Sequence, residues 1–395
     1  MNKKFIFSKI KIHDFYNLNI IKRLGSPLFD NIINTVSNKS MKTLNDNKNI
    51  LNVIDNIYIS TYIPSFVEIT LNKNFKKFSF NRFQGFLINL EDFNSIEDYM
   101  INQFGSKSRS KIRSYVKRLE TCFNIDYKFY YGFIEKPTYE LLFDKLELMI
   151  KRRFDQRGDK HQALQDWNYY KKSTYQEILN KNTSLFIIYD NNKPIDICIN
   201  YHYENIIINS IRAYDIDYSK FKLGYVDIFK QLEWSFENKI KLFDLGPGIL
   251  TYKKQWCNVV YDFRNYIIFK KTSFTKALFA SSLFLFYKLK IFLDRNNILQ
   301  DKGNKILDTS NNYAKDNTVE VFQLKTDEIP KNSELENNYT EIDFEHEEFM
   351  NLRNIIYDYL YLNFEQKNKV KVYKLNDSYN SFIIMGKKPS KFISK

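Results

Sequence analysis

The chain has 395 residues and a mass of 47.7 kDa, long enough for two or three domains with a sizeable core. Aromatic residues make up 17% of it, which excludes a disordered chain. The formal net charge is +14, and because the segment from Asp301 onward is slightly acidic, the excess lies in the first 300 residues. A basic body favours nucleic acid, a phosphorylated cosubstrate or an anionic membrane surface as partner; the alternative is a lysine-rich solvated surface.

Cysteine and histidine are scarce. Cys122, Cys198 and Cys257 have no metal or redox spacing, so we expect reduced thiols in a cytoplasmic protein. The four histidines form no zinc signature, and no metal is expected. The N-terminal segment is basic without a sustained apolar core, so we expect no signal peptide.

The first half of the chain predicts strands followed by helices. Residues 1–50 have weak periodicity. Alternating segments predict strands at 57–63, 66–71 and 83–90, and Asn94 or Ser95 begins a helix.

A basic amphipathic helix is predicted in GSKSRSKIRSYVKRLE (105–120). Its apolar residues recur at helical spacing and form a narrow stripe. Arg109 and Arg113 are among the basic residues on the rest of the helix surface. The helix could bind phosphate groups, and the alternative is a solvated charged face.

A denser succession of elements follows. We predict a strand at 124–131, helices at 138–154 and 167–179, strands at 184–190, 195–203 and 206–215, a helix at 224–238, strands at 242–245 and 263–271, and a helix at 276–295. The apolar run of the last helix is too short to span a bilayer. We expect this helix to pack against the core, with contact to a membrane surface as the alternative. A polar linker at 301–317 leads to a small α+β appendage.

The loop DYSKFKLG opens the helix at 224–238. A helix N-terminus offers backbone N–H groups and a partial positive charge, so it can bind phosphate. Lys220 and Lys222 add charge, and Gly224 would let a ligand approach the backbone. A plain glycine at the start of a helix is the alternative.

The segment FDLGPGILTYKKQW (243–256) stands directly after a predicted strand. Asp244 lies in an otherwise apolar strand, where a carboxylate is costly without a partner. Gly246 and Gly248 predict a sharp turn, and Tyr252 and Lys253 follow it. An acid, a phenol and an ammonium group could orient an amine nucleophile and stabilise a leaving group. A β-turn with surface polar residues is the alternative.

Three segments together resemble the FemAB-like branch of the GNAT acyltransferases, which includes CelD-like proteins and the BioF2-like acetyltransferase domain. They are SKSRSKIRSYVKRLE, SLFIIYDNNKPIDICINYHY and YDIDYSKFKLGYVDIFKQLEWSFENKIKLFDLGPGILTYKKQW, and the resemblance covers roughly residues 85–270. Leu223 stands where the family has a proline, and the Q-x-x-G-x-G/A loop of simple GNAT enzymes is absent from this chain.

The resemblance implies an α+β fold with a GNAT-like mixed, twisted sheet flanked by helices, in a tandem FemAB-like arrangement. We accordingly expect an N-terminal region with a degenerate GNAT-like half at 1–135, an acyltransferase domain with a closing helix at 136–300, and a linker with the appendage at 301–395.

The resemblance also implies transfer of an acyl group, in the first place acetyl from acetyl-CoA, to an amine such as an amino sugar or a bacterial cell-surface polysaccharide precursor. The predicted catalytic residues are Asp244, Tyr252 and Lys253. The predicted donor-binding residues are Lys220, Lys222, Gly224 and Tyr225. The predicted substrate-binding residues are Arg109, Arg113, Arg212, Tyr214, Asp215, Gly246, Gly248 and Trp256.

Two alternatives stay open at this point. FemAB-type relatives use aminoacyl-tRNA as donor, so transfer RNA is a candidate carrier, whereas DNA is not an expected partner. The other alternative is a non-catalytic protein on a decayed GNAT fold that binds polyanions or the inner face of a membrane.

Overall fold

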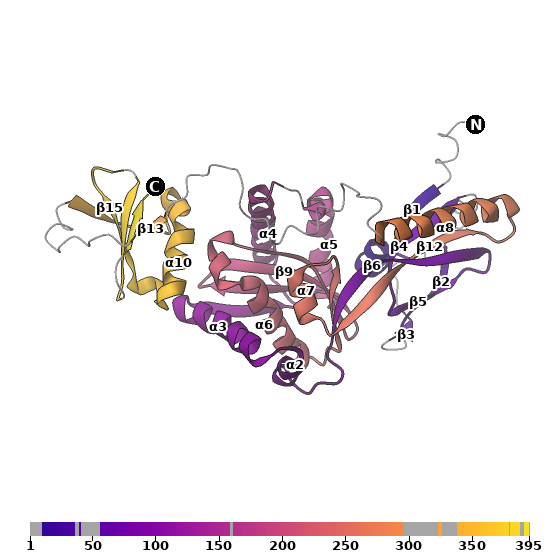
Figure 1. The fold of residues 1–395 in the computed structure, drawn as a ribbon, viewed down its shortest axis with the longest axis horizontal. Helices are drawn as coiled ribbons and strands as arrows, with labels where there is room; N and C mark the ends of the chain where they lie inside the picture. The colour runs from indigo at the N-terminus through magenta and orange to yellow at the C-terminus, as the bar shows by residue number, and fades with distance from the viewer. Residues whose placement is uncertain are drawn as a thin grey trace. The chain divides into compact units, whose positions relative to one another are not determined.

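The computed structural model describes residues 10–35, 39–40, 56–158, 161–295, 323–325, 338–378, 380–387 and 391–394 (Figure 1). The chain forms two compact units. Unit 1 comprises residues 1–89, 204–208 and 241–313, and unit 2 comprises residues 90–203, 209–240 and 314–395. The predicted linker at 301–317 lies outside the described residues, and the domain boundaries predicted after residues 135 and 300 stay predictions.

Unit 1 is built on a mixed sheet. Parallel pairs join β1 to β4 and β10 to β11, whereas β6 is antiparallel to both β11 and β12. In hydrogen-bonding order its strands are β1 (Ile10–Asp14), β4 (Ile57–Pro64), β12 (Val259–Lys270), β6 (Phe75–Asn89), β11 (Leu242–Pro247) and the first residues of β10 (Ile206–Tyr214). The strands β2 (Phe29–Asn34), β3 (Lys39–Ser40) and β5 (Val67–Leu71) form a separate sheet.

The strand predicted at 83–90 begins earlier than expected. β6 continues back through the polar pair Asn81 and Arg82 to Phe75. The side-chain amide of Asn81 donates to the Asp262 carboxylate of the neighbouring strand at 2.7 Å. A polar residue with a cross-strand partner does not interrupt a strand. The prediction from local composition therefore placed the start of this strand too late.

Helix α8 (Phe274–Arg295) lies along strands β6 and β12, as Figure 1 shows. Phe80, Ile267 and Ala280 belong to the buried cluster beneath it, and the expected packing against the core is confirmed. None of the helices in the described part of the chain has both the length and the apolarity that a bilayer crossing requires.

Unit 2 carries the antiparallel strands β9 (Lys193–Tyr203), β8 (Thr183–Asp190) and β7 (Ile125–Tyr130) beside the rest of β10. Its helices are α2 (Ile96–Gln103), α3 (Ser106–Cys122), α4 (Lys136–Gln156), α5 (Trp167–Leu179) and α6 (Leu223–Glu237), with a 3-10 turn, η3 (Gln162–Asp166), before α5. Ser95 caps α2 as predicted, because its hydroxyl accepts the Asp98 N–H at 3.1 Å.

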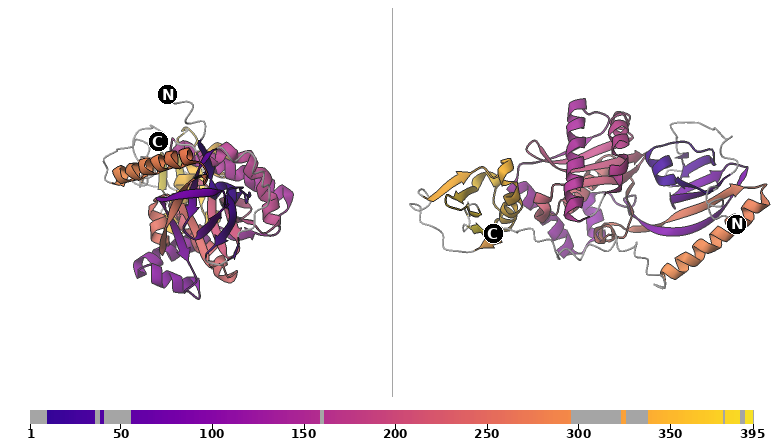
Figure 2. Two further views of the ribbon diagram at one scale, coloured as in Figure 1. Left: turned by 90° about the vertical axis from the view of Figure 1, so that its right-hand side faces the viewer. Right: turned by 90° about the horizontal axis from the view of Figure 1, so that it is seen from above.

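The helices cover both faces of the unit 2 sheet. Helix α4 packs against β9 and α5 against β8 (Figures 1 and 2). Alternate residues of a strand point to opposite faces, and Cys198 and Asn200 of β9 meet Asp227 and Gln231 of α6. The predicted α+β class, with a mixed sheet flanked by helices, is confirmed, while the tandem arrangement stays a prediction.

The C-terminal appendage packs within unit 2. It comprises β13 (Gln323–Lys325), β14 (Tyr339–Ile342), η6 (Glu347–Leu352), α10 (Arg353–Asn363), η7 (Lys367–Lys369), β15 (Lys371–Leu375), β16 (Ser381–Met385) and β17 (Lys391–Ser394), in the sheet order β13-β17-β16-β15-β14. Helix α10 lies against the 3-10 helix η4 (Ile216–Phe221). The rings of Tyr218 and Tyr357 are 4.6 Å apart, and Lys367 forms an ion pair with Asp190 at 2.6 Å.

Candidate active site

The segment FDLGPG folds as the end of a strand that is interrupted by a bulge. β11 pairs with β6 through Asp244, and the register shifts before Pro247. Gly246 in this shift has φ +71°, and Gly248 has φ +101°. Side chains other than glycine rarely adopt such angles, so both glycines serve the turn. The backbone N–H of Gly246 consequently points back and donates to Asp244 Oδ1 at 2.8 Å.

Asp244 is the centre of a hydrogen-bond network within unit 1. Its side chain is fully buried. The Tyr261 hydroxyl of β12 lies 2.9 and 3.0 Å from its two carboxylate oxygens, and the Tyr16 hydroxyl donates to Oδ2 at 3.2 Å. Tyr16 opens the π-helical turn η1 (Tyr16–Ile21) and is half-buried, so it is the most exposed of the three side chains.

Burial raises the pKa of Asp244 to about 6, although the Gly246 N–H, the Tyr261 hydroxyl and the nearby Lys253 ammonium each lower it. Because the pKa in the folded state exceeds the ordinary value of 3.8, the folded chain holds this proton more tightly than the unfolded chain. Stability is therefore lost as the pH rises from about 4 to about 6, by about 3 kcal/mol. Above that range Asp244 is ionised and can accept a proton.

Gly85 makes room for the ring of Tyr261. The two residues are directly paired between β6 and β12. A Cβ atom on Gly85 would lie 2.2 Å from Tyr261 Cζ. The tyrosine ring is packed edge-on against Phe66 and tilted against Phe263, so it has no free end that could move aside. The glycine thus lets the phenol lie across β6 and reach Asp244.

Gly85→Ala is expected to lower the free energy of unfolding by about 3 kcal/mol, because overpacking costs about 1–3 kcal/mol and displacing the phenol removes one of the three hydrogen-bond donors of the buried Asp244. Urea unfolding followed by circular dichroism measures the change. Gly105→Ala is the matched control, since a Cβ there has no neighbour within 4 Å, and less than about 1 kcal/mol is expected. Equal effects of the two substitutions would contradict the close approach at Gly85.

Lys253 joins the same cluster. It lies in α7 (Thr251–Trp256), a short helix that the sequence did not predict, and it is buried. Its ammonium donates to the Pro247 carbonyl at 2.7 Å and closes the glycine turn. Tyr252 precedes it in α7 and is half-buried. Trp256 is fully buried in the core, and its predicted role in substrate binding stays a prediction.

The predicted donor-binding residues lie around the start of α6 in unit 2. Lys222 caps this helix in a left-handed conformation, with φ 56°, and its side chain is exposed. Gly224 lies in the first turn, and the ring of Tyr225 tilts against Tyr115 at 5.9 Å. Lys220 instead forms an ion pair with Asp358 of the appendage at 3.4 Å. Its predicted contact with donor phosphate stays a prediction.

Four predicted substrate-binding residues of unit 2 make contacts within the chain. Arg113 forms an exposed ion pair with Glu97, and Arg109 donates to the Phe104 carbonyl. Tyr214 lies under the guanidinium of Arg153. Asp215 caps η4 and forms ion pairs with Arg152 at 2.8 Å and Lys193 at 3.0 Å. These contacts account for the four side chains structurally, and a role in substrate binding stays a prediction.

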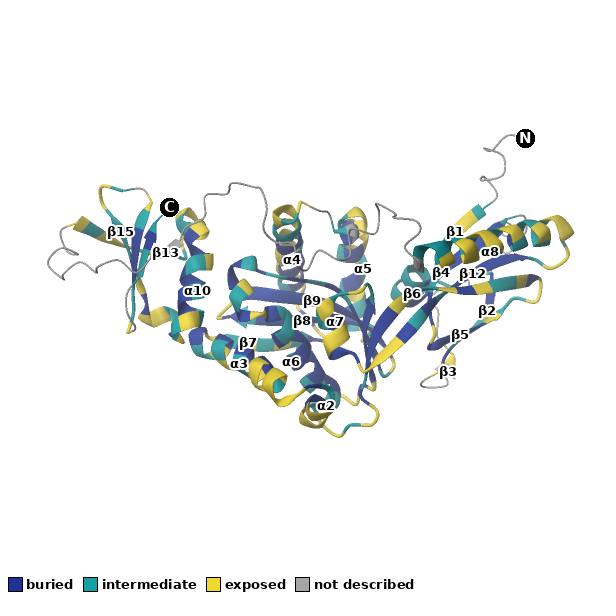
Figure 3. Cartoon of the chain, viewed as in Figure 1, coloured by how far each residue is buried: buried dark blue, intermediate teal, exposed yellow. Residues whose placement is uncertain are grey.

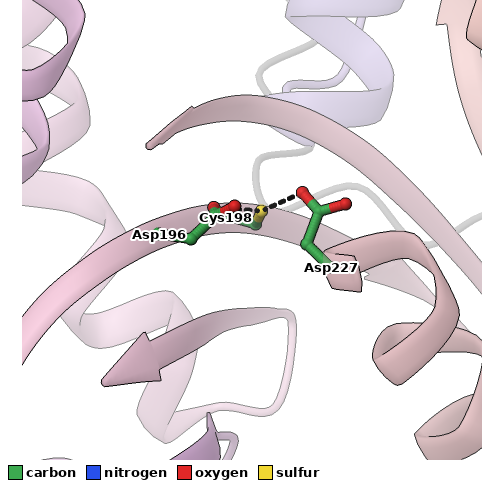
Figure 4. A group of neighbouring side chains, drawn as sticks. All are labelled: Asp196, Cys198 and Asp227. Carbon is green, nitrogen blue, oxygen red and sulfur yellow. Dashed lines mark hydrogen bonds between the residues drawn. The ribbon is translucent and has the colours of Figure 1, made fainter. Parts of the chain in front are cut away.

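Arg212 belongs to a buried cluster between β9, β10 and α6. Its guanidinium forms an ion pair with Asp227 at 2.5 Å and donates to the Gly224 carbonyl at 3.1 Å. Figure 4 shows the neighbouring groups: the Cys198 thiol lies 3.5 Å from Asp196 Oδ1 and 3.4 Å from Asp227 Oδ2. Arg212 therefore holds the first turn of α6 against the sheet.

Asp196, Cys198 and Asp227 place three potential metal ligands within 4.8 Å of one another. Burial raises the pKa of Asp196 and of the Cys198 thiol well above their ordinary values, and it raises that of Asp227 to about 6. The charge of Asp227 is compensated by Arg212. Protons and a guanidinium thus supply the positive charge that a cation would bring, and we interpret the cluster as structural.

Sequence reasoning missed Tyr16, Tyr261 and Gly85. Tyr16 is 228 residues from Asp244 in the chain, and no local motif connects them. An isolated glycine inside a strand often marks a close approach of another group, so Gly85 in FQGFLINL was a usable signal. It would have pointed to a bulky neighbour but not to Tyr261.

Residues 106–254 match a family described as an acetyltransferase (GNAT) domain. The match supports the predicted resemblance to GNAT acyltransferases over this part of the chain, and it supports acyl transfer in general. The matched region includes Asp244 and Lys253 and ends two residues before Trp256. No curated protein matches the chain.

Several solved structures are similar over part of the chain. One is a conserved protein of unknown function from Bacteroides thetaiotaomicron, with 11% identity over 58% of this chain and 78% of that chain and a TM-score of 0.35. L-PGS from Bacillus licheniformis has 13% identity over 57% and 72%, with a TM-score of 0.37. FemX has 10% identity over 56% and 74%, with a TM-score of 0.39. Likenesses this weak define neither the fold nor the function of the chain.

Proposed function

We propose that the protein is an N-acyltransferase that transfers an acyl group, in the first place acetyl from acetyl-CoA, to the amine of an amino sugar or a polysaccharide precursor. The observation that carries the proposal is the GNAT acetyltransferase match over residues 106–254, which includes the buried and hydrogen-bonded Asp244. The sequence resemblance to CelD-like proteins supports the choice of acceptor.

The amine is activated through Tyr16 in this proposal. Asp244 is fully buried, whereas Tyr16 is half-buried and donates its hydroxyl proton to the carboxylate. As the amine nitrogen attacks the acyl carbonyl carbon, its proton passes to the Tyr16 oxygen while the Tyr16 proton passes to Asp244. A carboxylate with a pKa of about 6 suits this task at neutral pH.

The acyl carbon then loses its bond to the coenzyme sulfur, and the leaving thiolate takes a proton. Tyr252, half-buried in α7, is our candidate for this proton donor. Backbone N–H groups beside the central strand would stabilise the oxyanion. The Lys253 ammonium, held on the Pro247 carbonyl, adds positive charge near Asp244.

The donor phosphates are assigned to the start of α6. Lys222 at the cap and the backbone of Gly224 offer a positive side chain and the positive end of a 15-residue helix. Lys220 belongs to the same assignment, and its ammonium would then exchange the Asp358 carboxylate for a donor phosphate.

Aminoacyl-tRNA is the competing donor, and the basic surface of α3 favours it. Lys107, Lys111 and Lys117 are exposed along this helix, as a binding surface for a polynucleotide backbone requires. An enzyme of this kind would extend a peptide or glycan precursor.

Acetyl-CoA is expected to raise the unfolding temperature, because a donor at a hundred times its Kd stabilises the fold by about 2.7 kcal/mol. It is also expected to acetylate an amino-sugar acceptor. Thermal shift and release of free coenzyme thiol measure the two effects. Desulfo-coenzyme A lacking the acyl group is the control for binding without transfer. Stabilisation by charged tRNA together with no effect of any acyl-CoA would overturn acyl-CoA as donor.

A further inference from the structure

Helix α8 of unit 1 exposes a largely apolar face, interrupted by Ser282. At about 100° per residue, its exposed large side chains fall within roughly a third of the helix circumference. Figure 3 shows exposed residues recurring along the helix. The exposed fractions of these side chains are 82% for Phe274, 62% for Leu278, 66% for Leu285, 60% for Phe286, 57% for Leu289 and 60% for Phe292.

The opposite face of α8 is already occupied. Ala280 is buried, and Phe284 and Tyr287 stack on Phe78 and Phe80 of β6 with ring centroids 5.3 and 5.2 Å apart. The helix is therefore anchored on its own sheet and presents a second apolar face to the outside. Six large apolar side chains exposed on one stripe are unfavourable in water. Such an exposed apolar patch is typical of a docking surface.

The charges beside the stripe indicate which partner it fits. Lys288 and Lys290 lie on either flank of the apolar face by helical geometry, and Lys276 lies near its start. From Phe274 to Leu293 the helix contains no acidic residue. In a second copy docked on this face, α8 would offer these lysines no carboxylate between Phe274 and Leu293. An anionic lipid surface accepts both the apolar side chains and the flanking ammonium groups.

We propose that α8 is an interfacial helix that docks unit 1 on an anionic bilayer. The helix lies in the plane of the interface, with the stripe from Phe274 to Phe292 among the acyl chains and with Lys288 and Lys290 at the phosphates. The surface does not depend on the transfer reaction, so the docking proposal stands apart from the proposed function.

Cosedimentation with vesicles tests this docking. The full chain is expected to bind vesicles of 70% phosphatidylcholine and 30% phosphatidylglycerol at least about tenfold more tightly than pure phosphatidylcholine vesicles. Leu278→Glu with Leu285→Glu is expected to weaken that binding at least about tenfold. The matched control is Leu141→Glu with Leu148→Glu on α4, where two leucines at the same spacing are 54% and 56% exposed. This control should bind as the wild type does.

Circular dichroism establishes that both double variants keep the wild-type fold. Lys288→Gln with Lys290→Gln should reduce the preference for anionic vesicles while binding to neutral vesicles stays unchanged. Equal binding by the α8 and α4 variants would overturn the proposal. So would a dimer, detected by light scattering, that dissociates in the α8 variant without any binding of the wild type to vesicles, since the stripe would then serve a second copy.

Discussion

Asp244→Asn is expected to lower kcat/KM for acyl transfer by at least about a hundredfold, since loss of a general base typically costs this much. Asparagine keeps the volume of the side chain and one acceptor oxygen for the Gly246 N–H, so the turn at residues 244–248 is preserved. It cannot take the proton that Tyr16 passes on. A coupled assay of free coenzyme thiol measures the rate.

The matched control is Asp262→Asn on β12, whose carboxylate accepts from Asn81 outside the network. This variant should keep the wild-type rate. The pH profile separates a proton-accepting role from a structural one: the wild-type rate should rise as the pH passes about 6, where Asp244 ionises, and the residual rate of Asp244→Asn should show no such rise. An unchanged acid limb in the variant would contradict the assigned role.

The same substitution changes the dependence of stability on pH. Wild-type stability falls as the pH rises from about 4 to about 6, because the buried Asp244 loses its proton there. The side-chain amide of the Asp244→Asn variant has no proton to lose in this range, so that part of the decline should disappear. Urea unfolding at pH 4 and pH 7 measures the difference between the two chains.

Local sequence patterns predicted most elements of the fold. The hairpin of β8 and β9, strand β10 and helix α6 lie within two residues of their predicted bounds, since each has a strong apolar period and a polar turn beside it. The missed helix α7 has only six residues, Thr251–Trp256, and begins after a glycine turn. A period of 3.6 residues cannot be read from so short a segment.

The candidate site was predicted only within the continuous segment that carries Asp244, Tyr252 and Lys253. The glycine turn and the unusual carboxylate were visible in FDLGPG, because both features are local. The pairing of β6 with β11 and β12 brings Tyr261 to the carboxylate, and Tyr16 reaches it from η1, which packs against β1 and β4. Partners contributed by distant elements leave no local spacing in the sequence, so the network required the structure.

The predicted ligand roles of basic residues were the least secure part of the sequence reading. Lys220 was predicted to bind the donor and Arg212 the substrate, and the structure pairs them with Asp358 and Asp227. Asp358 comes from the appendage, which no resemblance covered. The sequence alone does not show whether a basic residue has an acidic partner within the fold.

Arg212→Met is expected to destabilise unit 2 by about 3–5 kcal/mol, because it leaves the fully buried Asp227 without its cation. The loss should be larger at pH 8 than at pH 5. In the wild type, burial raises the pKa of Asp227 to about 6, although Arg212 lowers it in part. Asp227 is therefore ionised mainly above pH 6, and the ion pair contributes to stability mainly there. Urea unfolding at both pH values measures the loss.

The control for this variant is Arg113→Met, which breaks the ion pair with Glu97 that is half exposed on both sides, and it should cost less than about 1 kcal/mol. The decisive comparison is Arg212→Met with Asp227→Leu. Removing both charges also relieves the repulsion that raises the pKa of Asp196, so the double variant should be more stable than Arg212→Met alone. If the double variant were as unstable as the single one, Arg212 would act through its bond to the Gly224 carbonyl, and the start of α6 would depend on that bond rather than on charge.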